Sequence, residues 1–485
     1  MSILEVVTMG PKPNIIFLVV DTCRASTFHG LLEQGKIPNF ESLLDGAVLY
    51  ENATAAGPWT VPSHGSMFTG LYPSQHGTSA DNPKFNPPNT PIAQILREEG
   101  YHTVGISANP WISPGFDFDK GFDRFKTAYD LFWGGAELGD IRNLSSRREQ
   151  FRALTDRVTM VSSAKTIGNI AYEKFWAKRF DSGAKKITSD ALSILKNTAD
   201  GPQFLFLNYM EPHLDYEPPD DLARDELPGD VELEEARQLN QNPWKYIAGQ
   251  ESMSPQHFEI LRSLYRAELR YLDTQIGRLL EELKQRNVMN NTCIVIAGDH
   301  GENIGDHGLM DHQYCLYQTL VHVPLAIRYP DTIAPRNVTD PVETKEIYGA
   351  LCEIANTGSE DVENPLLKEE DRGNQVISEY PEPQPSMDAL EERAGKLDDE
   401  THEYDRSLRA IRIGPWKLIE GSDGLTELYD LEEDPTETTP VCDTEQAERL
   451  HNLLVDELGE LTDGMNKESN VDETTQGRLE DLGYI

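Results

Sequence analysis

Residues 293–302 read Cys-Ile-Val-Ile-Ala-Gly-Asp-His-Gly-Glu, and this stretch decides the fold. Residues 294–297 form a short, β-branched apolar run followed by glycine, a pattern typical of a strand buried on both faces of a parallel sheet. Asp299 and His300 come directly after it. In open α/β sheets ligands bind beyond the carboxyl ends of the strands, so this pair is well placed to hold a metal ion. A polar turn that merely closes a strand is the alternative interpretation.

The charge of the chain is far from balanced. Its 485 residues are enough for one large domain and a smaller one, and 83 acidic against 43 basic side chains give a formal net charge of −40. A surface this negative repels nucleic acid and anionic membranes, so we expect neither as a partner. The composition is typical of halophilic proteins, in which concentrated salt screens the self-repulsion. An acidic protein of an ordinary cytosol is the alternative.

The cysteines and the apolar runs indicate the cellular compartment in which we expect the protein. Five cysteines, at positions 23, 293, 315, 352 and 442, are odd in number and show no C-x-x-C spacing, so no disulfide framework is predicted. The apolar run 15–20 ends at Asp21 and is too short for a signal peptide or a membrane span, and no other stretch approaches a span. We expect a cytoplasmic protein with no membrane span. Nothing in the sequence indicates its oligomeric state.

Predicted strands and helices alternate along most of the chain. Strands are predicted at 13–21, 103–108, 204–208, 294–297 and 323–329, and helices at 37–44, 62–69, 92–100 and 254–286. Residues 52–57 are small and predict a loop, while residues 130–200 are polar and predict a helical insertion. This order is typical of a large α/β domain, which we place at residues 1–358.

The C-terminal part has a different pattern. Residues 359–405 are acidic and contain prolines, which predicts a mobile surface linker with one strand candidate at 376–380. Short strands at 410–413, 416–419 and 428–431 and a helix at 444–461 follow. Residues 406–485 are therefore predicted to form a smaller antiparallel α+β subdomain.

Several chemically useful side chains follow predicted strands or begin a helix. Asp21, His213 and the Asp299-His300 pair stand at strand ends, and Thr60 stands at or just before the helix of residues 62–69, where anions bind readily. Because parallel strands present their ends at one edge, these groups can converge. Two acids, an imidazole and a hydroxyl suit one divalent ion such as Mn²⁺, Zn²⁺ or Mg²⁺.

Two further histidines lie near this set in the sequence. His64 is one helical turn beyond Thr60, and His312 follows His300 by a short interval. Imidazoles beside a metal suit general acid–base chemistry and the binding of a tetrahedral anion.

The order and spacing of several motifs resemble the sulfatase family of the alkaline-phosphatase superfamily over nearly the whole chain. The matching stretches are Pro13-Asn-Ile-Ile…Asp21, Thr60-Val-Pro-Ser-His-Gly-Ser-Met-Phe-Thr-Gly70, Gly100-Tyr101 with Thr103, Glu211-Pro-His213, Gly298-Asp-His-Gly301, Val323-Pro324-Leu325, and residues 412–431 with Trp-Lys-Leu-Ile and Glu-Leu-Tyr-Asp-Leu.

This resemblance implies a large mixed, mostly parallel sheet sandwiched by helices, with a C-terminal four-stranded sheet and helix. It also implies one divalent metal ion (Mn, Zn, Ca or Mg) and cleavage of sulfate or phosphate esters, including those of glycans and small organic molecules. By matching position, Asp21, Asp299 and His300 would be metal ligands together with Thr60 at the nucleophile position. His213 and His312 would contact the anion, with His312 standing where the family usually has Lys.

The departures from the family pattern are informative. Sulfatases carry Cys or Ser, converted to formylglycine, where this chain has Thr60, and Thr lacks the two-hydrogen Cβ that this oxidation needs, so no formylglycine is expected. His64 stands four residues after Thr60, where the family has Arg. Thr22 stands at the position of the family's second N-terminal acid. The family's Gly-Lys-Trp-His segment is replaced by Gly-Ile-Ser-Ala-Asn at residues 105–109.

Three functions stay open on the sequence. The first is a metal-dependent ester hydrolase, in which the ion activates a hydroxyl and a histidine protonates the leaving alcohol. The second is a transferase that passes a phosphoryl or sulfuryl group from Thr60 to a sugar or lipid hydroxyl, as in the lipoteichoic-acid synthase and phosphoethanolamine-transferase branch that a Thr nucleophile resembles. The third is a non-catalytic module that binds sulfo- or phospho-glycans.

Overall fold

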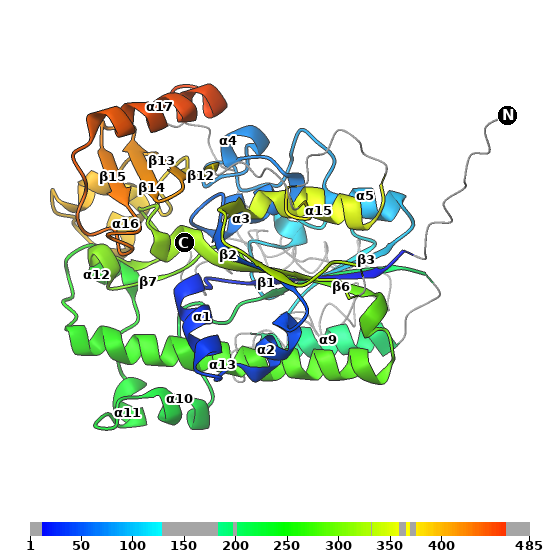
Figure 1. The fold of residues 1–485 in the computed structure, drawn as a ribbon. Coiled ribbons are helices and arrows are strands. Elements are labelled where there is room, and N and C mark those ends of the chain that lie inside the picture. The colour runs from blue at the N-terminus through cyan, green and yellow to red at the C-terminus, as the bar shows by residue number, and fades with distance from the viewer. Residues whose placement is uncertain are drawn as a thin grey trace, which may run out of the picture.

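The computed structural model describes residues 12–128, 183–196, 201–330, 332–357, 365–368 and 375–461, which form a large α/β domain and a smaller C-terminal subdomain (Figure 1). The strands of the large sheet are β1 (Asn14–Val20), β2 (Val48–Thr54), β3 (His102–Ser107), β4 (Arg124–Thr127), β5 (Gln203–Tyr209), β6 (Thr292–Gly298), β9 (His322–Arg328), β10 (Arg336–Val338) and β11 (Val342–Glu343). The longer helices around it are α1 (Ala25–Glu33), α2 (Pro38–Leu44), α3 (Thr60–Thr69), α5 (Ile92–Glu98), α9 (Ala184–Lys196), α10 (Asp220–Glu226), α13 (Pro255–Gln285) and α15 (Ile347–Ile354).

The nine-stranded sheet is mixed and mostly parallel. Its order is β10-β2-β9-β6-β1-β5-β3-β4, with β11 also paired to β2. The strands β6, β1, β5, β3 and β4 run parallel, whereas β9 is antiparallel to both β6 and β2. The predicted fold class is therefore confirmed. A β-bulge in β2 carries the strand into residues 52–54, so the loop predicted at 52–57 was wrong for its first half.

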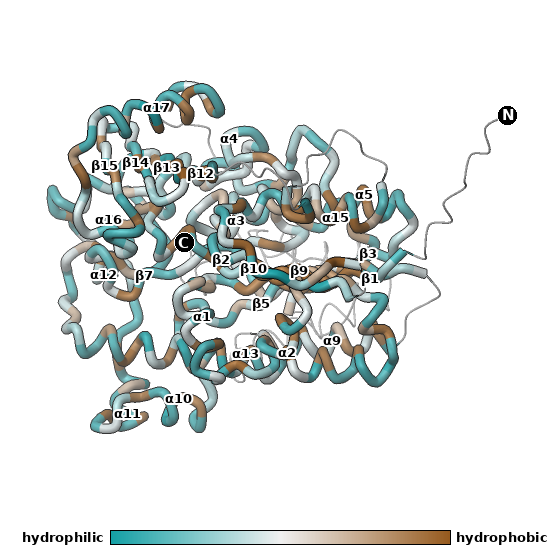
Figure 2. Tube along the Cα trace, in the orientation of Figure 1, coloured by the Kyte–Doolittle hydropathy of each residue, from teal (hydrophilic) through white to brown (hydrophobic). Residues whose placement is uncertain are grey.

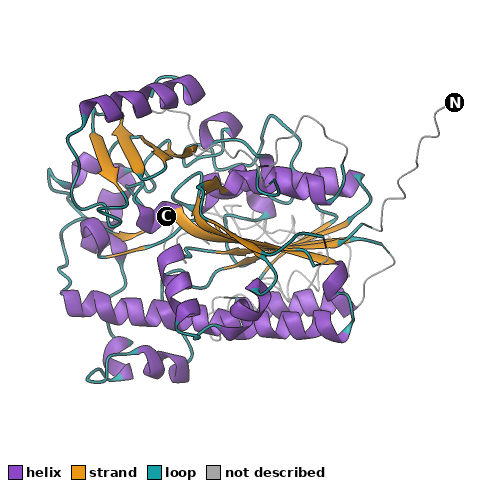
Figure 3. Ribbon diagram, viewed as in Figure 1, coloured by secondary structure: helices purple, strands orange, loops and turns teal. Residues whose placement is uncertain are grey.

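Helices cover both faces of this sheet (Figures 1 and 3). One face carries α1, α2, α9 and the 31-residue α13, and the other carries α3, α5 and α15. The central strands β1 and β6 are consequently buried almost throughout, which explains their unbroken apolar runs. Hydrophobic residues follow the strands and the inward sides of the helices (Figure 2). In the described ranges, no helix combines the length and the apolar character needed to cross a membrane.

A two-stranded ribbon follows β6. Its strands are β7 (Asn303–Ile304) and β8 (Met310–Asp311), which pair in antiparallel fashion. The ribbon turns the chain back toward the end of β6, because Asn303 is paired with Asp311. It therefore brings residues 311–313 beside the Asp299-His300 pair.

The C-terminal subdomain is a four-stranded antiparallel sheet of β12 (Gln375–Tyr380), β13 (Leu408–Ile413), β14 (Trp416–Gly421) and β15 (Thr426–Asp430). Helix α17 (Thr444–Leu458) packs Leu450 and Leu454 into a separate small core with Ile377, Ile411 and Leu418. Its last turn ends at Gly459, whose φ of +79° stops the helix before residue 461, where it was predicted to end.

The structure moves part of the predicted linker into this subdomain. Residues 375–380 form β12, an integral strand of the sheet, and α16 (Met387–Ala394) follows. β12 also contacts the large domain, because Ser378 Oγ donates to the carbonyl of Ala55 at 2.6 Å and Glu379 N donates to Ala56 O at 2.9 Å. The subdomain boundary therefore lies before residue 375 and not at 406. Of the insertion predicted at 130–200, residues 183–196 are described and include α9; the remainder lies outside the described residues.

Candidate active site

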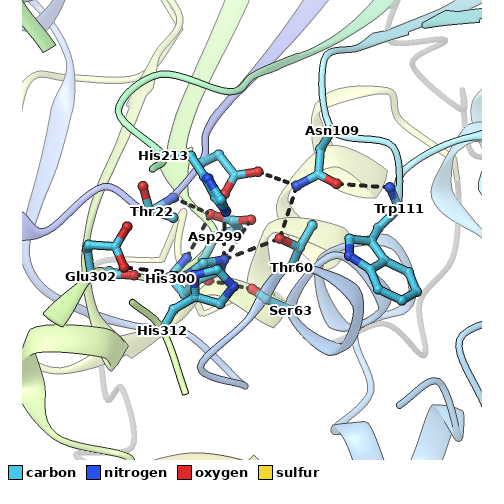
Figure 4. A network of polar contacts seen from close by, with 12 residues as sticks. Thr22, Thr60, Ser63, Asn109, Trp111, His213, Asp299, His300, Glu302 and His312 are labelled. Carbon is cyan, nitrogen blue, oxygen red and sulfur yellow. Dashed lines mark hydrogen bonds and ion pairs between the residues drawn. The ribbon is translucent and has the colours of Figure 1, made fainter. Parts of the chain in front are cut away.

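Four of the predicted site residues meet beyond the carboxyl ends of the central strands (Figure 4). Asp21 follows β1, and Asp299 and His300 follow β6. β1 and β6 pair in parallel up to their last residues, so the two aspartates come out side by side. Thr60 is the first residue of α3, and its side chain is fully buried beside them. The expected convergence of strand ends and helix start is what the fold produces.

His300 is at the centre of this group. Its Nε2 lies 3.3 Å from Thr60 Oγ1, and it lies 3.7 Å from Asp21 Oδ1 and 3.5 Å from Asp299 Oδ2. On the other side of the ring, Nδ1 donates to the carbonyl of Gly301 at 2.9 Å. A ring whose Nδ1 carries the proton keeps its lone pair on Nε2, which is the form that binds a metal ion.

The carboxylates are oriented so that one oxygen of each faces His300. Asp299 Oδ1 accepts hydrogen bonds from the backbone N–H groups of Thr22 at 3.2 Å and His300 at 2.9 Å. The other oxygen, Oδ2, and Asp21 Oδ1 are buried and have no hydrogen-bond partner among the described residues. Buried carboxylate oxygens without partners are costly unless a cation compensates them. With an imidazole nitrogen and a hydroxyl beside them, these residues fit a divalent ion.

The pKa shifts of the site residues also favour a bound cation. Burial raises the pKa of Asp21 to about 7, against the lowering effect of its hydrogen bond from Asn109. Burial and the adjacent Asp21 carboxylate raise the pKa of Asp299 well above its usual range. Burial also holds the pKa of His300 well below its ordinary value, so the ring is neutral. The two carboxylates therefore resist being ionised together unless positive charge is added.

His64 lies behind Thr60, on the side of the core. Its Nδ1 donates to the carbonyl of Thr60, one turn earlier in α3, at 2.9 Å and lies 3.6 Å from Asp299 Oδ2. Its ring contacts the rings of Phe68 and Phe206 edge to face, and burial lowers its pKa to about 3. A neutral ring packed in this way supports α3 and Asp299. The geometry favours positioning over the acid–base role that the sequence suggested.

His213 and His312 lie together on the other side of His300. The His312 ring centroid is 4.5 Å from that of His300 and 5.2 Å from that of His213. Burial would lower the pKa of His312, but the adjoining Asp311 carboxylate, and after it Glu302, raise it well above its ordinary value. Burial, followed by the nearby His312, lowers the pKa of His213 to about 4. The structure thus brings every predicted site residue into one region, and their roles stay predictions.

Asn109 is a site residue that the sequence reasoning missed. Its Nδ2 donates to Asp21 Oδ2 at 2.6 Å and to Thr60 Oγ1 at 3.2 Å, and its Oδ1 accepts the backbone N–H of Trp111 at 2.9 Å. A signal was present, because Asn109 follows the strand β3, which ends at the same edge of the sheet. The segment was interpreted only as a departure from a family motif. Asp311 and Glu302 were likewise missed, and both are buried beside His312.

The family model described as Sulfatase matches residues 13–357. The chain belongs to the sulfatase family. Its relatives include the choline-sulfatase of Rhizobium meliloti, which is 24% identical over 462 residues, covering 89% of this chain and 83% of that protein. The resemblance to the sulfatase family inferred from the motifs is confirmed, and the chain is an ester hydrolase of that family.

Solved structures share the fold of this chain. The phosphonate monoester hydrolase of Agrobacterium radiobacter aligns with a TM-score of 0.64 and 20% identity, covering 92% of this chain and 95% of that one. A protein solved in complex with its substrate D-glucosamine-2-N,6-O-disulfate aligns with a TM-score of 0.59 and 18% identity, covering 92% of this sulfatase-family chain and 97% of the other. At these identities the likeness shows the fold.

Proposed function

We propose that this sulfatase-family enzyme hydrolyses sulfate or phosphate esters through an unmodified Thr60 nucleophile, with one divalent cation at Asp21, Thr60, Asp299 and His300. The observation that carries the proposal is the distance of 3.3 Å between Thr60 Oγ1 and His300 Nε2. It places a hydroxyl group directly beside the candidate cation ligands, at the edge of the sheet where ligands of α/β folds bind.

The cation would be held by the partnerless oxygens of Asp21 and Asp299 together with His300 Nε2, which suit Mn²⁺, Zn²⁺, Ca²⁺ or Mg²⁺. When bound, such an ion favours the deprotonated form of a neighbouring hydroxyl and offsets the negative charge of the ester. These residues fit a divalent cation for two reasons. They supply the oxygen and nitrogen ligands that such ions prefer, and the two buried carboxylate oxygens without hydrogen-bond partners would be stabilised by positive charge.

Thr60 is well placed to act as the attacking group. As the first residue of α3 it lies at a helix N-terminus, where the helix dipole favours negative charge. The Asn109 amide, 3.2 Å away, orients the Thr60 oxygen. Because its Cβ carries a methyl group, Thr60 cannot be oxidised to formylglycine in the way a Cys or Ser can.

The reaction would proceed in two steps. Thr60 Oγ1 first gives its proton to solvent water. It then forms a bond to sulfur or phosphorus while the bond from that atom to the alcohol oxygen breaks. The leaving alcohol takes a proton from His312, which Asp311 keeps protonated, or from the neighbouring His213. In the second step water attacks the sulfur or phosphorus atom of the ester on Thr60 and gives a proton back to that histidine. The bond from this atom to Thr60 Oγ1 breaks, inorganic sulfate or phosphate leaves, and Thr60 Oγ1 takes up a proton from solvent.

The substrate class is supported by the names of relatives. One relative is a choline-sulfatase, one structural neighbour was solved with a sulfated glucosamine, and another is a phosphonate monoester hydrolase. We therefore propose a small organic or sugar-linked ester. The family favours sulfate, whereas a Thr nucleophile favours phosphate.

The test is a panel of nitrophenyl sulfate, phosphate monoester and phosphate diester, run at molar KCl with each of the four cations. Thr60→Ala should abolish turnover and Thr60→Ser should retain part of it. Thr69→Ala is the matched control, because Thr69 is buried in the same helix but donates its hydroxyl to Gly65 O at 2.7 Å. It should keep its activity.

Intact-mass analysis after a substrate pulse gives a second readout. A sulfuryl or phosphoryl adduct that maps to Thr60 supports the proposal, and its passage to an added alcohol in place of water would identify a transferase. Undiminished activity in Thr60→Ala would overturn the nucleophile assignment, since water would then be the attacking group.

A further inference from the structure

We propose that the C-terminal sheet positions His312 in the active site through a buried ion pair between Lys417 and Glu437. This inference rests on the proposed function, in which His312 gives a proton to the leaving alcohol. Lys417 lies in β14 and belongs to the Trp-Lys-Leu-Ile stretch of residues 416–419, which takes no part in the proposed reaction. Its Nζ lies 2.6 Å from Glu437 Oε1, and both side chains are buried.

Each member of the ion pair also holds a backbone group of residues 312–318, the segment that follows the β7–β8 ribbon. Lys417 Nζ donates to the carbonyl of Leu316 at 2.6 Å, and Glu437 Oε2 accepts the backbone N–H of Gln318 at 2.5 Å. A buried ion pair contributes little net stability, because the cost of desolvating two charges offsets most of their attraction. What these bonds do is fix the segment at one position against β14. Lys417 and Glu437 are therefore positioning residues.

Two tyrosines add contacts between the same region and the C-terminal part of the chain. Tyr314 OH donates to the carbonyl of Pro385 at 2.8 Å, and Tyr317 OH donates to Glu427 Oε2, in β15, at 3.0 Å. The other side of Tyr317 faces the ribbon, because its ring stacks on that of His307 with 3.7 Å between centroids. Both the ribbon that leads to His312 and the residues that follow it are docked on the C-terminal part.

The backbone around His312 needs this support. Asp311 has a φ of +72° and Tyr314 a φ of +65°, a conformation that residues with a side chain rarely adopt. Such residues persist only where the surrounding contacts hold them. The large domain holds Asp311 by pairing it with Asn303, and the C-terminal part holds Tyr314 through its hydroxyl group. His312 thus lies between one residue held by each part of the chain.

The turn that carries Glu437 is ordered by its own hydrogen bonds. Asp434 Oδ2 accepts the backbone N–H groups of Thr438 and Thr439, each at 2.7 Å, and the carbonyl of Asp434 accepts the N–H of Glu437 at 3.2 Å. The local structure of the turn, as well as the charge of Lys417, therefore directs the Glu437 carboxylate toward the segment.

This arrangement makes a specific prediction about leaving groups. A proton donor must lie within hydrogen-bond reach of the oxygen that it protonates. Protonation matters most when the departing oxygen is a strong base, so a displaced His312 should slow the cleavage of esters with poor leaving groups far more than that of esters with good ones. Loss of folded protein would slow both kinds of ester equally.

The experiment compares kcat for the phenyl and the nitrophenyl ester of the acid that the substrate panel favours, using the full-length chain at molar KCl. Lys417→Met combined with Glu437→Met removes both bonds to the segment and leaves no buried charge, so this variant should fold. Its kcat should fall about tenfold more for the phenyl ester than for the nitrophenyl ester. His312→Gln gives the full effect, a difference of about a hundredfold.

The matched control replaces another ion pair of the same sheet. Arg409 and Glu420 face each other across β13 and β14, with 3.0 Å between Nη2 and Oε2, and the described hydrogen bonds of this pair lead to Gly459 and His451. Arg409→Met combined with Glu420→Met should lower kcat for both esters by the same factor, if at all, and so leave their ratio unchanged.

Hydrogen exchange gives a readout that does not depend on turnover. Peptides that cover residues 312–318 should exchange several-fold faster in the Lys417→Met and Glu437→Met variant and at the wild-type rate in the control. Should the double variant fail to fold, Gln318→Pro carries the test, because it deletes only the N–H that Glu437 accepts. Proline is tolerated there, since Gln318 is the first residue of α14 (Gln318–Val321) and Tyr317 before it is extended.

The outcomes separate this inference from the proposed function. Unchanged exchange, or an unchanged ratio of the two esters in a variant that has lost the bonds, would overturn the positioning role. If His312→Gln selectively slows the phenyl ester in that case, the proposed proton donor stands. If His312→Gln slows both esters equally, His312 is not the proton donor, and the proton step of the proposed function is wrong together with this inference.

Discussion

Asn109 Nδ2 donates a hydrogen bond of 2.6 Å to Asp21 Oδ2, although the strand β5 lies between the strands β1 and β3 that precede the two residues. This bond engages one oxygen of Asp21 and leaves the other, Oδ1, directed at His300. The same amide nitrogen reaches Thr60 Oγ1. One side chain thereby sets the orientation of both a candidate cation ligand and the candidate nucleophile.

Substitution of Asn109 should therefore impair catalysis more than stability. Asn109→Ala should lower kcat by about a hundredfold, the usual cost of removing one positioned donor from an active site, with little change in the melting temperature. Steady-state kinetics on the best substrate of the panel would measure this. Asn290→Ala is the control, because Asn290 is exposed, and this variant should leave kcat and the melting temperature unchanged. A kcat within a few-fold of wild type in Asn109→Ala would contradict the role given to the amide.

The raised pKa of Asp21 predicts a pH-dependent stability in the metal-free enzyme. Between the ordinary value of 3.8 and the folded value of about 7, the folded chain keeps a proton on Asp21 that the unfolded chain has lost. The free energy of unfolding should consequently fall as pH rises through this window, by up to about 1.4 kcal/mol per pH unit from this group.

Urea unfolding across this pH range would measure the slope, and Asp21→Asn should flatten it. The buried side chain of Asn109 offers a check on the cause, because Asn109→Ala removes the hydrogen bond that lowers the Asp21 pKa and should extend the fall in stability to higher pH. A wild-type slope that Asp21→Asn leaves unchanged would assign the pH dependence to other groups.

Removal of divalent cations should destabilise the chain and abolish activity together. A ligand that binds only the folded state contributes about 2.7 kcal/mol when present at a hundred times its dissociation constant. Chelator treatment should lower the melting temperature by several degrees, and adding back Mn²⁺ or Zn²⁺ should restore it. In Asp299→Ala the melting temperature should no longer respond to the cation. Full activity of the chelated enzyme would exclude a catalytic ion.

The net charge predicts a strong dependence on monovalent salt. A charge of −40 on a compact body repels itself, and the Debye length shrinks from about 10 Å at about 0.1 M KCl to about 3 Å at about 1 M. The melting temperature should rise steeply over this range, as expected for a halophilic protein. The experiment should be done with and without divalent ions, so that site binding is separated from screening. A melting temperature independent of KCl would argue against this interpretation.

The convergence of Asp21, Asp299 and His300 could be predicted from the sequence because it follows from short-range information. Each residue stands directly after a buried apolar run, and parallel strands end at one edge. The direction of β9 could not be predicted in this way. A buried strand gives the same apolar run whether its neighbour is parallel or antiparallel, and the choice depends on the connection through the β7–β8 ribbon.

The positions of His64 and Asp311 depended on tertiary packing. Helical periodicity correctly put His64 one turn after Thr60, but its orientation is set by the rings of Phe68 and Phe206. Phe206 comes from a strand far away in the sequence. Asp311 enters the site through a ribbon only two residues long on each side and a positive φ, features that leave little trace in hydrophobic patterning.

The strand β12 joins the C-terminal sheet to the large domain, so the sequences of the two parts depend on each other. It is the edge strand of the C-terminal sheet, yet its residues 378 and 379 hydrogen-bond to Ala55 and Ala56, which lead directly to Thr60. A methyl group on Gly57, in the same segment, would meet the carbonyl of Glu379 at 3.3 Å. The C-terminal sheet therefore braces the segment that presents the nucleophile. Chimaeras between family members that exchange this sheet should lose activity unless residues 55–59 are exchanged with it, and recombination during evolution would face the same constraint.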